Sequence, residues 1–251
     1  MRLVAIVVTL FLSLGAWAQT ISTPEQLIAA MHDRYASKWY HTLSFKQDSI
    51  THKPDGTQST EVWYEGLQLP GHLRVNIGAP NSGNGMLFVN NHLYIYKDGK
   101  LAKDRDYIHP LLVLGFDVYG QPVDVTMKEL KDLEFDLSLL HEENFNGRPT
   151  YVVGAKQGDL KSRQFWIDKD RLYFVRLFEP DKQNPEQTQE IGFEDYKPAE
   201  GGGWVSEHVT VKVEGKLVFE ERYSDVKINP SLPPDFFDPS QFVQNGSAPA
   251  K

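Results

Sequence analysis

The stretch MLFVNNHLYIYKDGK, residues 86–100, decides the fold class of this 251-residue chain. Two short apolar runs, 86–89 and 92–96, flank Asn90 and Asn91, and such a pair favours a tight hairpin turn. The Asp-Gly pair that follows supplies a second turn directly afterwards. The stretch therefore predicts an antiparallel meander of short strands joined by tight turns.

The same pattern recurs along most of the chain. Asn146-Gly147 is a strong hairpin signal, and Val209, Val211 and Val213 alternate with polar residues as in a half-buried strand. We count about ten or eleven strands and two helical segments. A meander of this length either splits into two sheets or curls into a barrel. We expect a mainly β protein with a few helices (α+β), in which a curled antiparallel sheet forms an incomplete β-barrel closed by helices.

Two segments carry helix signals. Thr23 is a suitable N-cap, Pro24 suits the first turn and Gln26 completes a capping box, so we expect a helix that ends near Lys38. The second segment, about 107–135, interrupts the strand rhythm and contains an apolar run. We expect it to form one or two short helices that cover the concave face of the sheet.

The N-terminus has the pattern of a secretory signal. Arg2 precedes an apolar run, and Ala16-Trp17-Ala18 has the small-residue pattern that signal peptidase cuts. No cysteine follows the cut, so we expect release rather than a lipid anchor. The predicted organisation is a signal peptide at 1–18 cleaved after Ala18, one domain at 19–238, and a flexible tail at 239–251. We expect Phe236, Phe237 and Phe242 to hold part of the proline-rich end.

Composition excludes several function classes. The net charge of −8 argues against nucleic acid and against general adhesion to anionic lipid. The absence of cysteine excludes disulfides, thiolate zinc sites and thiol catalysis. No second long apolar segment follows the signal, so we expect no stable membrane insertion.

No catalytic or metal constellation stands out. The chain has no G-x-S-x-G elbow and no pair of histidines at helical metal-ligand spacing. His141 and Glu143 share one face of a predicted strand, which leaves a hydrolase or metal site conceivable, but a solvated strand face explains them more simply. We therefore assign no catalytic residue, no metal and no cofactor.

The order of these elements resembles the LolA/LolB-like family of bacterial lipoprotein carriers and outer-membrane lipoprotein-sorting proteins. The resemblance covers most of the mature chain, although each motif is short. The matching residues are Phe45-Lys46-Gln47, Glu65-Gly66-Leu67, Pro70-Gly71, Leu73-Arg74, the hairpin from Asn90 to Tyr96, and the closing strand from Tyr223 to Asn229 with Pro234 and Phe237.

The resemblance implies a non-enzymatic, soluble periplasmic carrier that holds lipoprotein acyl chains or lipid in an apolar cavity, for transfer towards the outer membrane. It also implies an inner-membrane ABC releaser and an outer-membrane receptor as partners. One position departs from the family, whose lipoprotein carrier has an arginine just before the Pro-Gly turn that is held to tie the lid shut. Here that residue is Leu69, and the nearest arginine is Arg74 on the next strand.

The candidate ligand-binding residues are apolar side chains of the predicted strands and of the helical insertion. The expected cavity lining is Leu43, Phe45, Trp63, Leu73, Val75, Leu87, Val89, Phe165, Ile167, Phe174, Val211 and Val213, and the expected lid is Leu111, Leu112, Leu114 and Phe116. The alternative is a sensor or interaction module of the same fold, whose concave surface binds a partner protein instead of lipid.

Overall fold

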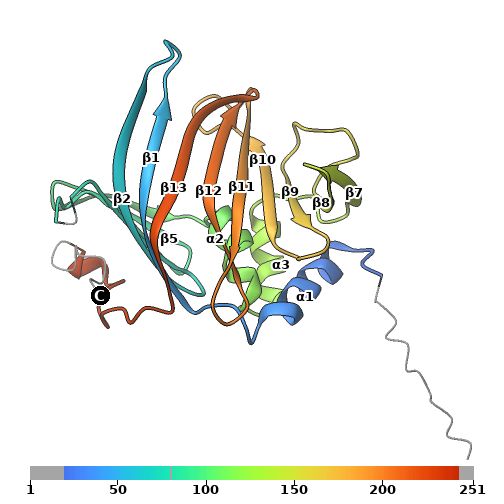
Figure 1. Ribbon diagram of the computed structural model, residues 1–251, viewed down its shortest axis with the longest axis horizontal. Helices are drawn as coiled ribbons and strands as arrows, with labels where there is room; N and C mark the ends of the chain where they lie inside the picture. Colours follow the sequence, from blue (N-terminus) through green and yellow to red (C-terminus); the bar gives the residue numbers. More distant parts are fainter. Residues whose placement is uncertain (1–19, 80, 243–251) are drawn as a thin grey trace, which may run out of the picture.

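The computed structural model describes residues 20–79 and 81–242, and these form one open antiparallel sheet of thirteen strands with helices against one face (Figure 1). The expected signal peptide and its cleavage site lie outside the described residues. The strand order across the sheet is β6-β5-β4-β3-β2-β1-β13-β12-β11-β10-β9-β8-β7. The expected curled-sheet architecture is therefore confirmed, with more strands than the sequence predicted.

The N-terminal half holds α1 and the first six strands. Their bounds are α1 Pro24–Tyr35, β1 Thr42–His52, β2 Gln58–Gln68, β3 His72–Ile77, β4 Gly85–Val89, β5 His92–Lys97 and β6 Lys100–Asp106. The helical segment that follows contains α2 Pro110–Gly115, η1 Asp117–Tyr119 and α3 Val123–Asp132. The C-terminal half contains β7 Leu140–Phe145, β8 Arg148–Val153, β9 Gln164–Asp168, β10 Phe174–Pro180, β11 Thr188–Pro198, β12 Trp204–Val213, β13 Lys216–Ile228 and η2 Pro239–Gln241.

The order of the strands in the sheet determines where the helices lie. Strand β1 pairs with β13 in the middle of the sheet, so β6 and β7, which are consecutive in the chain, lie at opposite edges. The chain between them must cross the whole width of the sheet. Residues 107–139 make this crossing, and α2, η1 and α3 consequently lie over the concave face, where α1 joins them (Figure 1).

Helix α1 begins at the N-cap residue expected from the sequence. The Thr23 hydroxyl accepts a hydrogen bond from the Gln26 amide at 3.2 Å. The Gln26 side chain reaches back to the amide of Ser22 rather than to that of Thr23, as a capping box would have it. The buried face of α1 includes Leu27, Ile28 and Met31, which show no exposed surface and fix the helix on the sheet.

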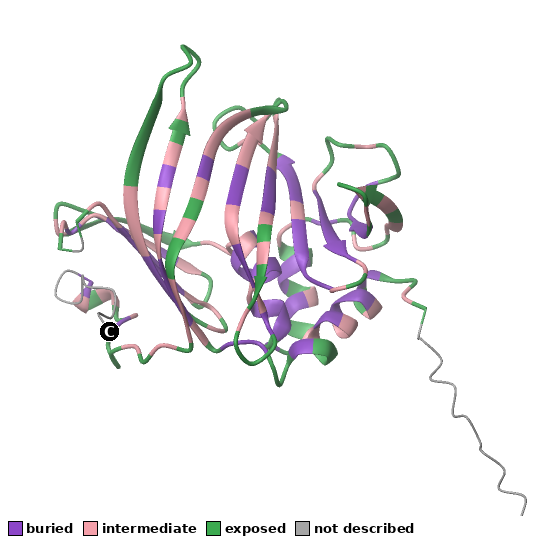
Figure 2. Cartoon of the chain, viewed as in Figure 1, coloured by how far each residue is buried: buried purple, intermediate pink, exposed green. Residues whose placement is uncertain are grey.

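The main core lies between the helices and the concave face of the sheet, and it includes residues of both halves of the sheet (Figure 2). Trp39 stacks on Tyr119 of η1 with ring centroids 3.7 Å apart, and Phe135 packs edge-on against Phe165 at 5.1 Å. The Tyr119 hydroxyl accepts a hydrogen bond from the Phe174 amide at 3.0 Å. Here the helices fill the curve of the sheet completely.

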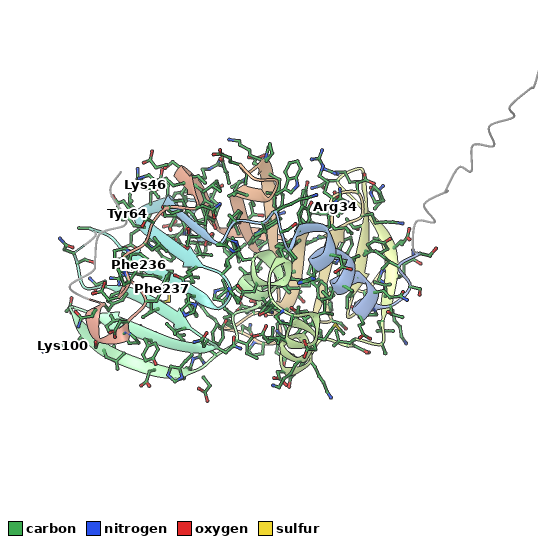
Figure 3. The ribbon with its side chains drawn as sticks, turned by 90° about the horizontal axis from the view of Figure 1, so that it is seen from below. Arg34, Lys46, Tyr64, Lys100, Phe236 and Phe237 are labelled. Atoms are coloured by element: carbon green, nitrogen blue, oxygen red, sulfur yellow. The ribbon has the colours of Figure 1, made fainter. Side chains whose placement is uncertain are left out.

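A second contact covers the outer face of β2 to β5. The C-terminal segment runs beneath these strands and brings Phe236 and Phe242 against them (Figure 3). Gly66 allows this approach, because a Cβ at that position would lie 2.6 Å from the Phe236 ring. Phe242 stacks on Tyr96 with centroids 4.0 Å apart. Residues 239–242 of the expected flexible tail are thus packed, and 243–251 lie outside the described residues.

Arg74 fastens this segment. Its side chain is fully buried on the outer face of β3, donates a 3.0 Å hydrogen bond to the Phe236 carbonyl and donates another to the Phe242 carbonyl. The guanidinium carbon lies 5.0 Å from the centre of one phenylalanine ring and 4.3 Å from the other. Burial lowers the pKa of Arg74 to about 10, so the side chain is charged at neutral pH.

One strand that the sequence did not predict is β6. All seven of its residues are exposed, and its Lys-Leu-Ala-Lys-Asp-Arg-Asp sequence shows no apolar alternation. It exists because its backbone pairs with β5 at the sheet edge. Charged edge strands discourage further pairing, which suits an open sheet. Within the described ranges, no helix combines the length and apolar character needed to cross a bilayer.

Replacing Arg74 with methionine should free the C-terminal segment, because the carbonyls of Phe236 and Phe242 would lose their charged donor. We expect a loss of about 2–4 kcal/mol in the free energy of unfolding, measured in urea. Cleavage near residue 236 in limited proteolysis should also accelerate. The exposed Arg105→Met variant is the control, and equal stability of the two variants would contradict this role.

Candidate functional site

An apolar pocket lies on the concave face of the N-terminal half, between the sheet and α2. It contains about 600 Å³ of empty space, including the part that opens to solvent. Its apolar lining consists of Phe45, Trp63, Leu67, Leu73, Val75, Met86, Phe88, Leu111, Leu112, Phe116 and Phe193, and its polar lining of Glu65, His109, Glu221 and Tyr223.

Period-two alternation builds the floor of this pocket. Trp63, Glu65 and Leu67 alternate along β2, so all three face the concave side. The neighbouring β1 contributes Phe45, which stacks on Tyr223 of β13 with centroids 4.0 Å apart. The floor is thus made by strands that meet at the central β1–β13 junction.

The lid of the pocket is α2. Pro110 starts the helix, and the His109 ring caps it by accepting from the Leu112 amide at 3.4 Å. Burial lowers the pKa of His109 to about 3, and the charge of Lys182 adds to this effect. The imidazole is therefore neutral at physiological pH.

A buried polar cluster ties the lid segment to two strand turns. The Gly71 amide, between β2 and β3, donates to the Asp117 carboxyl at 3.1 Å. Glu129 of α3 accepts from Asn91, between β4 and β5, at 2.7 Å and from Gln121 at 2.8 Å. These bonds hold η1 and α3 to the rim of the sheet beside the pocket.

This cluster lies where the family's lid arginine is expected. Leu69 packs against the main core and its amide donates to the His41 carbonyl, so it supplies no such link. Arg74 points to the opposite face, where it binds the C-terminal segment. In this chain the lid segment is fastened at the Pro-Gly turn by Asp117 instead.

Two carboxyl groups lie inside the pocket. Burial raises the pKa of Glu65 well above its ordinary range, and repulsion from Glu221 adds to the rise. Burial also raises the pKa of Glu221, although a 2.7 Å hydrogen bond from the Tyr223 hydroxyl opposes this. The two groups therefore resist ionising together.

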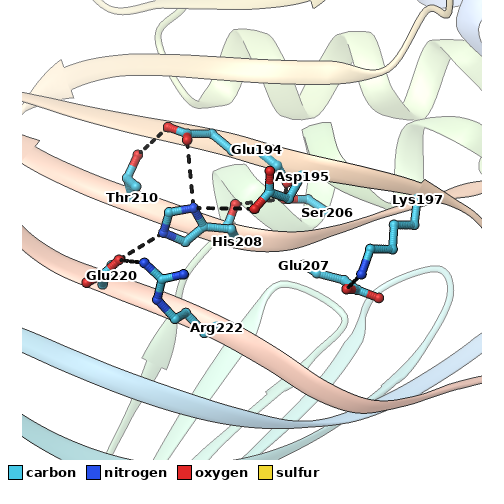
Figure 4. A network of polar contacts seen from close by, with 9 residues as sticks. All are labelled: Glu194, Asp195, Lys197, Ser206, Glu207, His208, Thr210, Glu220 and Arg222. Atoms are coloured by element: carbon cyan, nitrogen blue, oxygen red, sulfur yellow. Dashed lines mark hydrogen bonds and ion pairs between the residues drawn. The ribbon is translucent and has the colours of Figure 1, made fainter.

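On the opposite face of the sheet, Glu220 belongs to a network of polar contacts (Figure 4). Glu220 has His208 at 2.9 Å, Arg222 at 2.9 Å and His52 at 3.0 Å. Burial alone raises the pKa of Glu220, but the hydrogen bonds of the two histidines and the charge of Arg222 lower it overall. Adjacent glutamates in β13 thus have opposite surroundings, since Glu220 faces outward and Glu221 faces the pocket.

Another hollow, at the outer rim, offers a different surface. It lies between α3 and the ends of β6 and β10, and contains about 1320 Å³ including open solvent. Charged residues such as Lys128, Asp132, Arg163 and Lys182 line much of it. More than half of the surface of this hollow is polar, whereas most of the surface of the pocket under α2 is apolar, so the pocket under α2 is the candidate site.

The structure brings part of the predicted site together. Phe45, Trp63, Leu73 and Val75 from the expected lining meet at the pocket, as do Leu111, Leu112 and Phe116 from the expected lid. Leu114, also expected in the lid, is fully buried in the main core.

The other expected lining residues lie elsewhere. Leu43, Phe165, Ile167 and Phe174 are buried in the main core, Val211 packs against that core, and Val213 ends β12 half-exposed. For β4 the expected facing is reversed, because Leu87 and Val89 pack outward with Phe242 and Phe237. Its alternate residues, Met86 and Phe88, line the pocket instead.

His141 and Glu143 lie on the edge strand β7, and their closest side-chain atoms are 3.4 Å apart. This strand contributes nothing to the lining of the pocket. In residues 20–79 and 81–242, no three histidine, aspartate or glutamate side chains group as a metal site.

No protein-family model matches the chain, and no curated protein sequence matches it. Solved structures do. A domain from Vibrio parahaemolyticus described as an outer membrane lipoprotein-sorting protein domain aligns with a TM-score of 0.58 and 14% identity, over 87% of this chain and 97% of that one. A DUF1329 family protein from Desulfovibrio piger aligns at 0.54 with 15% identity, over 87% and 97%.

A LolA superfamily protein from Nitrosomonas europaea aligns at 0.53 with 13% identity, over 88% of this chain and 99% of that one. Identities this low establish the architecture and not the cargo. The LolA-like fold expected from the sequence is therefore confirmed.

Asp117 should give the protein a characteristic pH dependence. Burial raises its pKa from 3.8 to about 8, against the opposing hydrogen bond from Gly71. Between these values the folded state binds more protons than the unfolded state, so the free energy of unfolding falls as pH rises, by up to about 1.4 kcal/mol per pH unit. Asp117→Asn should remove this contribution, because the amide cannot titrate, and leave the slope that Glu65 and Glu221 add through their own raised pKa values.

The measurement is urea unfolding of both proteins from pH 4 to pH 8. The exposed Asp124→Asn variant in the first turn of α3 is the control and should keep the wild-type slope. If the free energy of unfolding depends on pH in the same way in wild type and in Asp117→Asn, Asp117 does not titrate as a buried group with a raised pKa.

Proposed function

We propose that this protein is a periplasmic carrier that holds a hydrocarbon chain, from acylated lipoprotein or lipid, in the pocket under α2. The observation that carries the proposal is the pocket itself, an apolar hollow between the sheet and a short helix. The N-terminal signal pattern supports export. A solved structure of the same fold bears a lipoprotein-sorting description, which supports transfer towards the outer membrane.

The energetics suit a carrier. Each buried methylene contributes about 0.8 kcal/mol, so a twelve-carbon chain gains roughly 9 kcal/mol, of which association removes at least about 4 kcal/mol. The net affinity is moderate and reversible, as loading and release require. Binding breaks no covalent bond, and the proposal needs no catalytic residue or cofactor.

Loading requires movement of the lid. Leu111 and Leu112 project from α2 into the pocket, and a full acyl chain needs part of the space that they occupy. Because α2 has only six residues, we expect it to shift as a unit while Asp117 holds the segment next to it, and this shift moves Val113 and Leu114 within the main core. An inner-membrane releaser and an outer-membrane receptor are the partners that such a cycle implies.

Uptake of diphenylhexatriene, a hydrocarbon that fluoresces in apolar surroundings, tests the proposal. The wild-type protein should bind it, and Met86→Trp, which adds bulk inside the pocket, should weaken binding by about tenfold or more. Tyr64→Trp adds an indole to β2 on the opposite face and should leave affinity unchanged.

Near-ultraviolet circular dichroism checks that both variants fold. Failure of the wild-type protein to bind the probe would refute the carrier proposal. If folded Met86→Trp binds diphenylhexatriene as tightly as the wild-type protein does, the probe binds outside this pocket.

A further inference from the structure

The floor of the apolar pocket contains a group of hydrogen-bond acceptors that the carriage of plain hydrocarbon does not explain. Glu65 lies in the middle of β2 between Trp63 and Leu67, and only 8% of its surface is exposed. Burying an ionisable group in apolar surroundings is costly unless a partner compensates. The position of Glu65 therefore points to a partner that arrives with the ligand.

The acceptors in this floor outnumber the donors. In the described part of the chain, the Glu65 carboxyl takes part in no hydrogen bond or ion pair, whereas Glu221 accepts hydrogen bonds from the Tyr223 hydroxyl and from the Gln47 side chain. Gln47 is fully buried between Trp63 and Tyr223 in the sheet, and its Oε1 atom has no partner. Its amide nitrogen is already used by Ser49, at 2.8 Å.

The outer face shows how this fold pairs a carboxylate when the chain supplies the partners. Glu220 has two histidines and Arg222 around it (Figure 4), whereas Glu221, the next residue, has none of these. Among the described residues that line the pocket, none is a lysine or arginine, and His109 is neutral. The pocket thus holds acidic acceptors without a cation of its own.

Resting on the proposed carrier function, we infer that the pocket selects amphiphiles whose polar group donates hydrogen bonds, above all a primary ammonium, which Glu65 and Glu221 receive. An ammonium group has three N–H donors and no acceptor, and the carboxyl oxygens of Glu65 and Glu221 are the acceptors that the pocket offers it. The hydrocarbon chain lies against the apolar wall that includes Val75, Met86 and Leu112.

The same arrangement disfavours an anionic head group. A carboxylate brought next to Glu65 and Glu221 finds no counter-charge and adds a third acid. A hydroxyl group is intermediate, because it donates one hydrogen bond and carries no charge. Three ligands with one chain length therefore separate the head-group effect from the hydrocarbon effect.

The experiment is displacement of diphenylhexatriene at pH 7 by dodecylammonium, dodecanol and dodecanoate, each below its micelle concentration. Wild-type protein should bind dodecylammonium about tenfold more tightly than dodecanol, and dodecanoate more weakly than dodecanol. In Glu65→Gln/Glu221→Gln the three affinities should converge to within about twofold. Glu142→Gln/Glu207→Gln makes the same two substitutions outside the pocket and should keep the wild-type order.

The outcomes distinguish the two proposals. Binding of diphenylhexatriene with equal affinities for the three ligands would overturn the head-group selectivity and leave the carrier function standing. Selectivity that persists in folded Glu65→Gln/Glu221→Gln would also overturn it. No binding of any probe would remove the carrier function and this inference together. If the double variant does not fold, the order of the three affinities in the wild-type protein tests the head-group selectivity by itself.

Discussion

The pairing of β1 with β13 is the constraint on which the rest of the structure depends. It joins two meanders at the centre of the sheet and sends β6 and β7 to opposite edges. The segment 107–139 must then cross the concave face, and it crosses as short helices. Over the C-terminal half these helices and α1 fill the curve, whereas over the N-terminal half α2 leaves a pocket. The candidate site is thus a product of topology as much as of side-chain chemistry.

Much of this fold is predictable from local signals, and the predictions that were wrong failed for physical reasons. The Asn-Asn and Asn-Gly turns, the cap at Thr23 and the alternating strands all act over a few residues. The facing of β4 could not be predicted, because the strand is apolar on both sides. The C-terminal segment covers one side and the pocket uses the other. That double coverage depends on contacts such as that between Arg74 and Phe242, more than 160 residues apart.

The candidate site was only partly predictable for a related reason. Phe165 and Phe174 do face the concave side, but the helices fill the space above them, and no sequence pattern distinguishes a filled interior from a pocket. Glu65 did carry a signal, since it alternates with Trp63 and Leu67 and must share their face. What the alternation could not predict is that α2 buries this acid without giving it a partner.

The methyl groups of the methionines allow the most direct test of the central claim that hydrocarbon enters the pocket under α2. Of the three methionines after residue 18, Met86 lines the pocket, Met31 is buried in the main core and Met127 lies on α3. The measurement is ¹³C-methyl NMR of the protein during titration with a nitroxide-labelled alkane. The account predicts that the Met86 signal broadens first and Met31 and Met127 much later. Equal broadening of the three signals, or broadening that starts at Met127, would contradict it.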